Sequence, residues 1–196
     1  MDTSHYFAAA PTSASAPRTV SLALHDLTVD LRTDRGVFSA EHVDPGTKVL
    51  LMTAPAPPAT GELLDLGCGY GPITVAIALR SPGAHVWAVD VNERARALTG
   101  ENARAAGAAN VTVAGGEEVP ADLRFAAIYT NPPIRVGKLG LHGLLDAWVP
   151  RADVTWMVVS KHLGADSLAR WMVDERGWSV SRRASRVSYR VLEVRP

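Results

Sequence analysis

The sequence predicts an α/β fold, in which a mostly parallel sheet carries helices on both faces and ends in an antiparallel edge. Three observations predict this fold class. After Gly61, short apolar runs alternate with amphipathic stretches, which is the pattern of repeated strand-helix units. A glycine-rich turn, DLGCGYG at 65–71, joins the first of these runs to the first amphipathic stretch. Two further apolar runs, joined only by a turn, end the chain.

Length and composition predict a single domain. The chain has 196 residues, of which 47% are hydrophobic, enough for one well-formed core and too few for two. We expect a flexible arm over residues 1–18, because AAAPTSASAP at 8–17 offers small and proline residues that bury little area. Residues 19–196 then form one domain, with an N-terminal extension over 19–60 and a core over 61–196.

The extension contains the first predicted elements. Apolar residues alternate on both sides of His25-Asp26, which predicts a β-hairpin over residues 19–31. Asp44 followed by Pro45 is typical of an N-cap and a first helical residue, so a short helix is expected there.

The core elements follow in a regular order. Asn92 and Gly107 mark the start and the end of the second core helix. The expected strands are 62–66, 85–90, 111–114, 125–130, 154–160, 178–183 and 187–194, and the expected helices are 73–79, 93–106 and 165–176.

Charge and cysteine content exclude several classes of protein. Lys plus Arg and Asp plus Glu both number 20, so no net positive field marks a nucleic-acid binder, and any RNA contact must come from local patches. The only cysteine is Cys68, which excludes a disulfide framework and a zinc cluster and favours a reducing cytoplasm. The histidines lack ligand spacing, so no metal is expected, and no apolar run reaches the roughly 18 residues of a membrane span.

The glycine loop predicts a cofactor site. Gly67, Gly69 and Gly71 allow the backbone to approach a ligand at the start of a helix. Their GxGxG spacing differs from the GxGxxG of dinucleotide binders, which favours S-adenosylmethionine over NAD. Asp65, just before the glycines, could accept from the cationic amine of that cofactor. The alternative is an ordinary strand-to-helix turn.

Two acidic residues follow later strands. Asp90 ends the next strand, where a carboxylate can accept from both ribose hydroxyls, and we place Val91 beside it in the cofactor site. The alternative role for Asp90 is to cap the following helix, although Asn92 is better placed for that. Glu117 could accept from the adenine amine, or it could simply be solvated.

The Asn131-Pro132-Pro133-Ile134 segment predicts the reaction. It follows the apolar run at 125–129, so the asparagine stands at the end of a strand. There its carboxamide oxygen and the carbonyl of Pro132 can both accept from a planar amine. Asn131 and Pro132 are therefore the expected catalytic residues, with Asn131 also facing the cofactor, and methylation of an NH2 group is the expected chemistry.

Taken together, these motifs resemble the small-domain class I S-adenosylmethionine-dependent methyltransferases, especially the short single-domain relatives of the ribosomal RNA small-subunit guanine-N2 enzymes. The resemblance implies a Rossmann-like class I sheet and methyl transfer to an exocyclic amine of guanine in ribosomal RNA. It also implies RNA or a ribosomal subunit as partner, and it leaves monomer and dimer both open. The matching segments are 5–7, 36–39, 64–73, 89–95, 130–138 and 161–165.

Position 134 departs from that family, which has an aromatic residue after the prolines to stack on the base. Phe38 is a second candidate for that role, and Pro133, Ile134, Arg135 and Lys138 complete the expected substrate side. Arg135 and Lys138, in a loop at the mouth, could meet phosphates or be ordinary surface charges. The alternative functions are methylation of a protein glutamine or a small amine, and a non-catalytic nucleotide-binding module.

Overall fold

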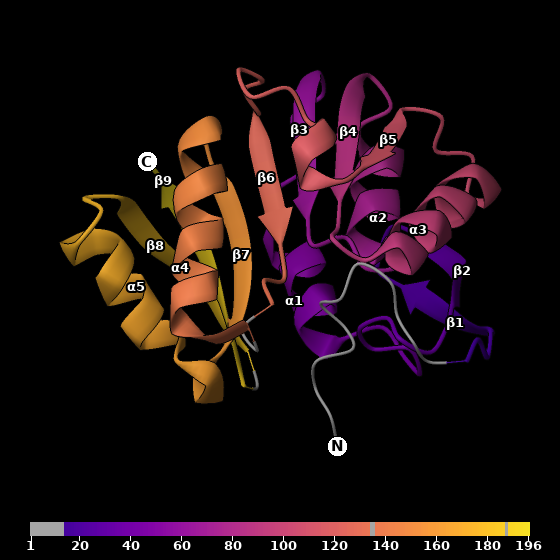
Figure 1. The fold of residues 1–196 in the computed structure, drawn as a ribbon, viewed down its shortest axis with the longest axis horizontal. Helices are drawn as coiled ribbons and strands as arrows, with labels where there is room; N and C mark the ends of the chain where they lie inside the picture. The colour runs from indigo at the N-terminus through magenta and orange to yellow at the C-terminus, as the bar shows by residue number, and fades with distance from the viewer. Residues whose placement is uncertain (1–13, 134–135, 187) are drawn as a thin grey trace.

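The computed structural model describes residues 14–133, 136–186 and 188–196 (Figure 1). Its main sheet has seven strands in the order β5-β4-β3-β6-β7-β9-β8. The first five of these in the chain run parallel: β3 (Gly61–Leu66), β4 (Ala84–Val89), β5 (Val111–Ala114), β6 (Ala127–Thr130) and β7 (Thr155–Ser160). β9 (Tyr189–Arg195) lies antiparallel between β7 and β8 (Ser179–Arg186). The predicted α/β sheet with an antiparallel C-terminal edge is confirmed.

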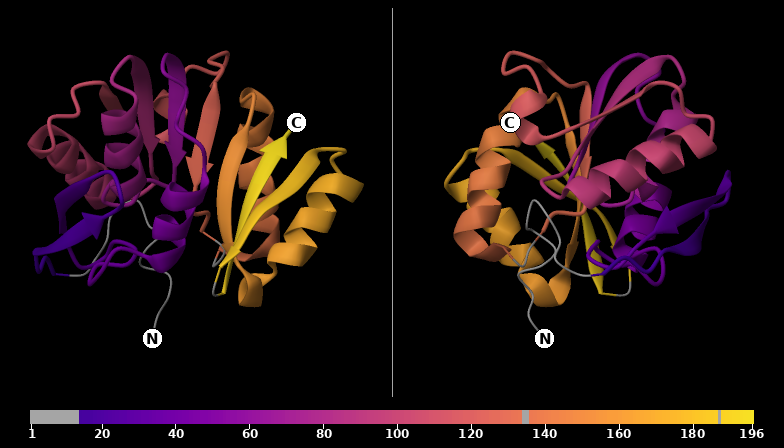
Figure 2. Two further views of the ribbon diagram at one scale, coloured as in Figure 1. Left: turned by 180° about the vertical axis from the view of Figure 1, so that it is seen from behind. Right: turned by 45° about the vertical axis from the view of Figure 1, so that its right-hand side comes forward.

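The helices pack in two groups, which Figures 1 and 2 show on opposite faces of the sheet. α1 (Pro45–Thr53), α2 (Pro72–Arg80) and α3 (Glu93–Ala105) contribute to one large buried cluster. α4 (Gly137–Trp148) and α5 (Ala165–Asp174) contribute to a second, with β7 and β9. Short 3-10 turns follow at η2 (Gly116–Glu118), η4 (Val149–Arg151) and η5 (Lys161–Leu163). No helix among the described residues is long and apolar enough to cross a membrane.

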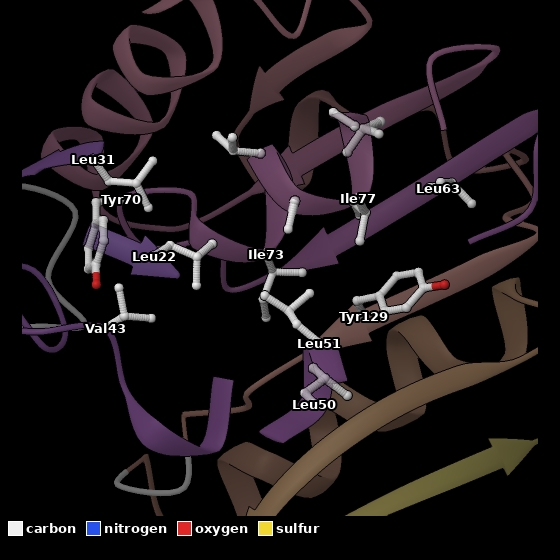
Figure 3. Close-up of a cluster of buried hydrophobic side chains, with 14 of the residues drawn as sticks. Leu22, Leu31, Val43, Leu50, Leu51, Leu63, Tyr70, Ile73, Ile77 and Tyr129 are labelled. Atoms are coloured by element: carbon white, nitrogen blue, oxygen red, sulfur yellow. The ribbon is translucent and has the colours of Figure 1, made fainter. Parts of the chain in front are cut away.

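The N-terminal extension shares the core of the domain. β1 (Arg18–Ala23) and β2 (Thr28–Thr33) pair antiparallel as the predicted hairpin. Leu22 and Leu31 are fully buried in the same cluster as α1 and α2, and Figure 3 shows them near Tyr70 of the loop after β3. The hairpin is therefore packed against the sheet domain.

The start of the chain falls largely outside the described residues. The predicted arm and the aromatic cluster at 5–7 lie there, apart from residues 14–18. Within that stretch, the backbone N–H of Ala16 donates to Asp34 and Arg18 already begins β1. The division into arm, extension and core stays a prediction.

The structure corrects one part of the sequence analysis. Residues 137–148 form α4, whereas the sequence analysis placed Lys138 in a loop. Three glycines, at 137, 140 and 143, weaken the local signal for a helix. Buried Leu141, Leu145 and Trp148 nevertheless recur at helical spacing, so packing against the sheet stabilises the helix in spite of its glycines.

Both predicted N-caps are confirmed. The side chain of Asp44 accepts from Thr47 N at the start of α1, and Pro45 occupies the first turn. Asn92 accepts from Arg94 N and Ala95 N at the start of α3. These caps fix where each helix begins, and each lies beside the site described next.

Candidate cofactor and acceptor site

The site lies at the carboxyl end of β3. At this strand the order of the strands in the sheet changes direction. β4 and β5 lie on one side of β3, and β6 and β7 lie on the other. The loops that follow neighbouring strands separate at such a point and leave a crevice. A cavity of about 520 Å³ opens there, between the glycine loop, the end of β4, the Asn-Pro-Pro segment and α1.

The glycine loop lines the cavity with bare backbone. Gly67 and Gly69 have φ angles of +79° and +59°, and a Cβ added to either would meet no protein atom within 4 Å. Gly71 differs, because a Cβ there would lie 3.1 Å from the side chain of Thr99. The first two glycines therefore leave room for a ligand to lie against the chain, while the third is needed for packing.

The backbone donors of this loop are largely occupied within the protein. Gly67 N and Cys68 N donate to Val89 O at 2.8 and 3.0 Å, and Gly71 N donates to Cys68 O at 2.9 Å. Gly69 N donates to a carboxylate oxygen of Asp90 at 2.9 Å. The loop therefore allows a ligand to approach the backbone closely, but it offers the ligand few free N–H groups.

Asp90 connects the glycine loop to the start of α3. One carboxylate oxygen accepts from Gly69 N and the other from Asn92 N, each at 2.9 Å. The side chain borders the cavity, and burial raises the pKa of its carboxyl. Since each carboxylate oxygen has two lone pairs, both can accept a further bond from a ligand hydroxyl. Val91, which is 56% exposed, lines the same wall.

Asp65 lies beneath the loop and is fully buried. Its Oδ2 accepts from the backbone N and the Oγ1 of Thr74 at 2.8 and 2.6 Å, which ties β3 to α2. Its Oδ1 has no partner among the described residues. Burial raises the pKa of this carboxyl to about 7. Asp65 does not line the cavity, so the predicted contact with a cofactor amine stays a prediction.

The far wall of the cavity is formed by Gly116 and Trp148. A Cβ on Gly116 would lie 3.6 Å from the indole ring, so the bare backbone of the glycine and the ring lie close together in the cavity lining. Glu117, the predicted adenine contact, is exposed in η2 and does not line the cavity. Trp148 is not among the residues predicted from the sequence, because no helix was predicted at 137–148, although its spacing from Leu141 and Leu145 indicates a shared helical face.

Asn131 reaches the cavity from the end of β6 with its carboxamide fixed. Its amide nitrogen donates to Asp44 Oδ1 at 2.9 Å and to Thr47 Oγ1 at 3.1 Å, both from the first turn of α1. No described residue donates to the carboxamide oxygen. Pro132 and Pro133 line the cavity beside it, and the peptide bonds that precede them are trans.

The remaining predicted substrate residues have different positions. Phe38 lines the cavity and is 51% exposed, so an aromatic face is available at the mouth. Lys138 is exposed on the first turn of α4 and does not line the cavity. Ile134 and Arg135 lie outside the described residues.

Tyr189, which is not among the residues predicted from the sequence, lines the cavity from the first position of β9. Its ring packs on the α1 backbone, where a Cβ on Gly46 would come within 2.6 Å of it. Burial and the charge of Asp44 raise the pKa of its hydroxyl. No local sequence signal marks this tyrosine, because only the pairing of β9 with β7 brings it to the site.

Cys68 is buried in the glycine loop, where burial raises the pKa of its thiol well above the ordinary value. Its sulfur accepts from Thr99 Oγ1 at 3.5 Å. A buried thiol with a raised pKa is a poor nucleophile, which agrees with a packing role for Cys68. Within the described ranges, no group of three or more His, Cys, Asp or Glu side chains is placed to hold a metal ion.

Comparison with known proteins identifies the family. A profile of the methyltransferase small domain matches residues 28–175. The Bacillus subtilis protein YbxB is 36% identical over 169 residues, which cover 83% of this chain and 84% of YbxB. The ribosomal RNA small subunit methyltransferase C of Aeromonas hydrophila is 36% identical over 123 residues, covering 60% of this chain. The match spans only 34% of that longer relative.

A solved structure has the same fold. The T. thermophilus 16S rRNA N2 methyltransferase RsmC, in complex with AdoMet and guanosine, superposes with a TM-score of 0.77 at 24% identity, over 94% of this chain and 52% of that one. The extent of the profile match confirms the predicted family and enzyme class. The chain belongs to the methyltransferase small domain family and is an S-adenosylmethionine-dependent methyltransferase.

Proposed function

We propose that the chain methylates the exocyclic amine of a guanine in small-subunit ribosomal RNA. The observation that carries this proposal is the orientation of Asn131. Because its amide nitrogen donates to Asp44 and Thr47, its carboxamide oxygen is left to accept from an incoming NH2 group. The names of the ribosomal RNA relatives supply the substrate class. The cytoplasmic location predicted from the single cysteine belongs to the same proposal.

The cofactor half of the cavity fits S-adenosylmethionine. The free space beside Gly67 and Gly69 leaves room for the methionine part of the cofactor. Asp90 has two carboxylate oxygens that can accept from the ribose hydroxyls. The indole ring of Trp148 and the bare backbone of Gly116 offer the adenine ring an apolar surface. When bound, the cofactor would supply an activated methyl group on a positively charged sulfur, and that sulfur would keep the electron pair of the carbon–sulfur bond.

The part of the cavity that would bind the target base has to orient a weak nucleophile. The lone pair of a guanine amine is delocalised into the ring, and two acceptors that hold its hydrogens pull the nitrogen toward tetrahedral geometry. We assign these two roles to the side-chain oxygen of Asn131 and the carbonyl of Pro132, because both residues line the cavity. Since the methyl group is already activated, alignment of the two reactants supplies much of the acceleration, on the order of 7–11 kcal/mol in favourable cases. No strong general base is required.

RNA contacts are expected at the same edge of the sheet. Arg35 precedes Phe38, Lys138 lies on the first turn of α4, and Lys161 directly follows β7; all three residues are exposed. None of them forms an ion pair with another described residue. The aromatic rings of Phe38 and Tyr189 at the cavity wall are suited to hold a base.

The test is transfer of tritiated methyl groups from S-adenosylmethionine to small ribosomal subunits, naked small-subunit RNA and a ribosome-free protein extract. Nucleoside analysis should find the label in N2-methylguanosine, and an Asn131→Ala protein should bind the cofactor but transfer far less. Label confined to glutamine in the extract would replace this proposal with the protein substrate. Label in a different nucleoside would reject the guanine amine.

A further inference from the structure

One carboxylate oxygen connects the N-terminal extension to the proposed catalytic asparagine. Oδ1 of Asp44 accepts from Thr47 N at 3.0 Å and from the amide nitrogen of Asn131 at 2.9 Å. The second N–H of that amide reaches Thr47 Oγ1 at 3.1 Å. Asp44 and Asn131 are 87 positions apart in the chain, and both line the cavity.

We infer that Asp44 is a positioning residue that fixes which end of the Asn131 carboxamide faces the target amine; this inference rests on the proposed function. A carboxylate only accepts hydrogen bonds, so the amide nitrogen must point toward it. Turning the carboxamide over would break both N–H bonds and bring its oxygen against the carboxylate oxygen of Asp44, which has no hydrogen to donate. The acceptor atom of Asn131 is therefore set before any substrate arrives.

The charge of Asp44 adds a second effect. A hydrogen bond to a carboxylate polarises the carboxamide and makes its oxygen a stronger acceptor. The target nitrogen gains positive charge as it takes up the methyl group, and it then loses one proton to water. The negative charge of Asp44, relayed through the Asn131 amide, favours that transient positive charge.

Three substitutions separate these effects. Asp44→Ser keeps an oxygen that can cap α1, but its side chain is one atom shorter and uncharged, so it releases Asn131. Asp44→Asn keeps the shape and the accepting oxygen while removing the charge. Asp146→Ser is the matched control, because Asp146 on α4 is paired with Arg176 and does not line the cavity.

In methyl transfer to small-subunit RNA, kcat should fall roughly 10- to 100-fold in Asp44→Ser, which is the loss expected for a hydrogen bond to a charged group. Asp44→Asn should lie between this variant and wild type. Binding of S-adenosylmethionine, measured by calorimetry, should change by less than about twofold. Wild-type kcat in Asp44→Ser would overturn the inference, as would a loss of cofactor affinity as large as the loss of kcat, since that indicates a collapsed cavity.

A second readout needs no RNA. In protein labelled with 15N-asparagine, the side-chain NH2 signal of Asn131 is identified by its disappearance in Asn131→Asp. The wild-type signal should show a downfield proton shift and slow exchange with water, and both should be lost in Asp44→Ser but not in Asp146→Ser. Wild-type protein that leaves RNA unlabelled would reject the proposed function while this signal still tests the positioning. An Asn131 signal unchanged in Asp44→Ser would overturn the positioning itself.

Discussion

The two glycines at the cavity wall combine an unusual backbone conformation with open space. Gly67 and Gly69 have positive φ angles and no protein atom near the position of an added Cβ. A side chain at either position would therefore carry two separate penalties. One is backbone strain in the folded protein, and the other is the volume taken from the ligand. Both penalties can be measured by comparing this substitution with the same substitution at a glycine that has a positive φ but lies away from the cavity.

Gly67→Ala should bind S-adenosylmethionine at least roughly tenfold more weakly, because its methyl group enters the cavity. Gly107→Ala is the matched control, since Gly107 has a φ of +76° and also meets nothing within 4 Å, but it does not line the cavity. Both variants should lose about 1–2 kcal/mol of stability from strain. Calorimetric titration and urea unfolding measure the two effects. Equal cofactor affinity in the two variants would contradict this assignment of Gly67.

Asp65 makes the stability of the protein depend on pH. Burial raises the pKa of its carboxyl from 3.8 to about 7. Between these values the unfolded chain releases a proton that the folded protein keeps, so the stability contributed by this group falls as pH rises, and the fall levels off above about pH 7. Below about pH 3 both states are mostly protonated and the group has almost no effect.

Asp65→Asn keeps an oxygen for the two donors of Thr74 and cannot ionise. Its free energy of unfolding should match that of wild type near pH 3 and exceed it by a few kcal/mol at pH 8, since each unit of pKa shift corresponds to about 1.4 kcal/mol. Urea unfolding across this pH range measures the difference. A constant difference between the two proteins would show that the pKa of Asp65 is not raised.

At the scale of elements, the hairpin and α1 build part of the site although they precede the sheet in sequence. α1 carries Asp44, Thr47 and the backbone under Tyr189, and the hairpin packs against the same cluster. Leu22 and Leu31 anchor it with no exposed surface. The extension should therefore unfold together with the sheet.

Leu31→Ala should destabilise the whole protein by about 2–5 kcal/mol, the usual range for a buried leucine. Tryptophan fluorescence and far-ultraviolet circular dichroism should report one coincident transition in urea. Val173→Ala is the control, because Val173 is 47% exposed and its loss should change stability by less than about 0.5 kcal/mol. A separate transition at lower urea concentration, involving only part of the circular dichroism signal, would show that the hairpin unfolds on its own.

The elements that the sequence predicted well are those with strong local signals. Asp44-Pro45 and Asn92 mark helix starts that depend only on neighbouring residues, and both are confirmed. α4 was missed because its glycines oppose a helix locally, whereas its stability comes from distant contacts of Leu141 and Leu145. For the same reason Trp148 and Tyr189 were not proposed for the site: only the folded sheet brings them there.

At the scale of the whole molecule, charge is balanced and much of it is paired. Four of the five arginines in β8 and β9 contact acidic partners: Arg183 and Arg195 contact Glu193, and Arg182 and Arg190 contact Asp166. Most of the positive charge at this edge of the sheet is therefore compensated within the protein, which makes the edge a poor surface for RNA. Exposed cations near the cavity mouth are better placed to meet phosphates.

Replacing both Lys138 and Lys161 by Gln should raise KM for ribosomal RNA several-fold. It should also reduce the slope of log affinity against log salt by roughly 1–2, because each phosphate contact contributes about 0.7–0.9. Arg124→Gln is the control, since Arg124 is exposed at the opposite end of the sheet, just before β6. Filter binding at several salt concentrations measures the slope. An unchanged slope in the double variant would place the RNA on another surface.

The position of β9 determines when the site is completed during synthesis. β9 lies between β7 and β8, although it is the last of the described strands to be made. Until residues 189–195 have left the ribosome, β7 has an unpaired edge and the cavity lacks the wall formed by Tyr189. A nascent chain can therefore assemble the glycine loop and Asp90 early, but the acceptor side of the cavity is closed only by the final strand.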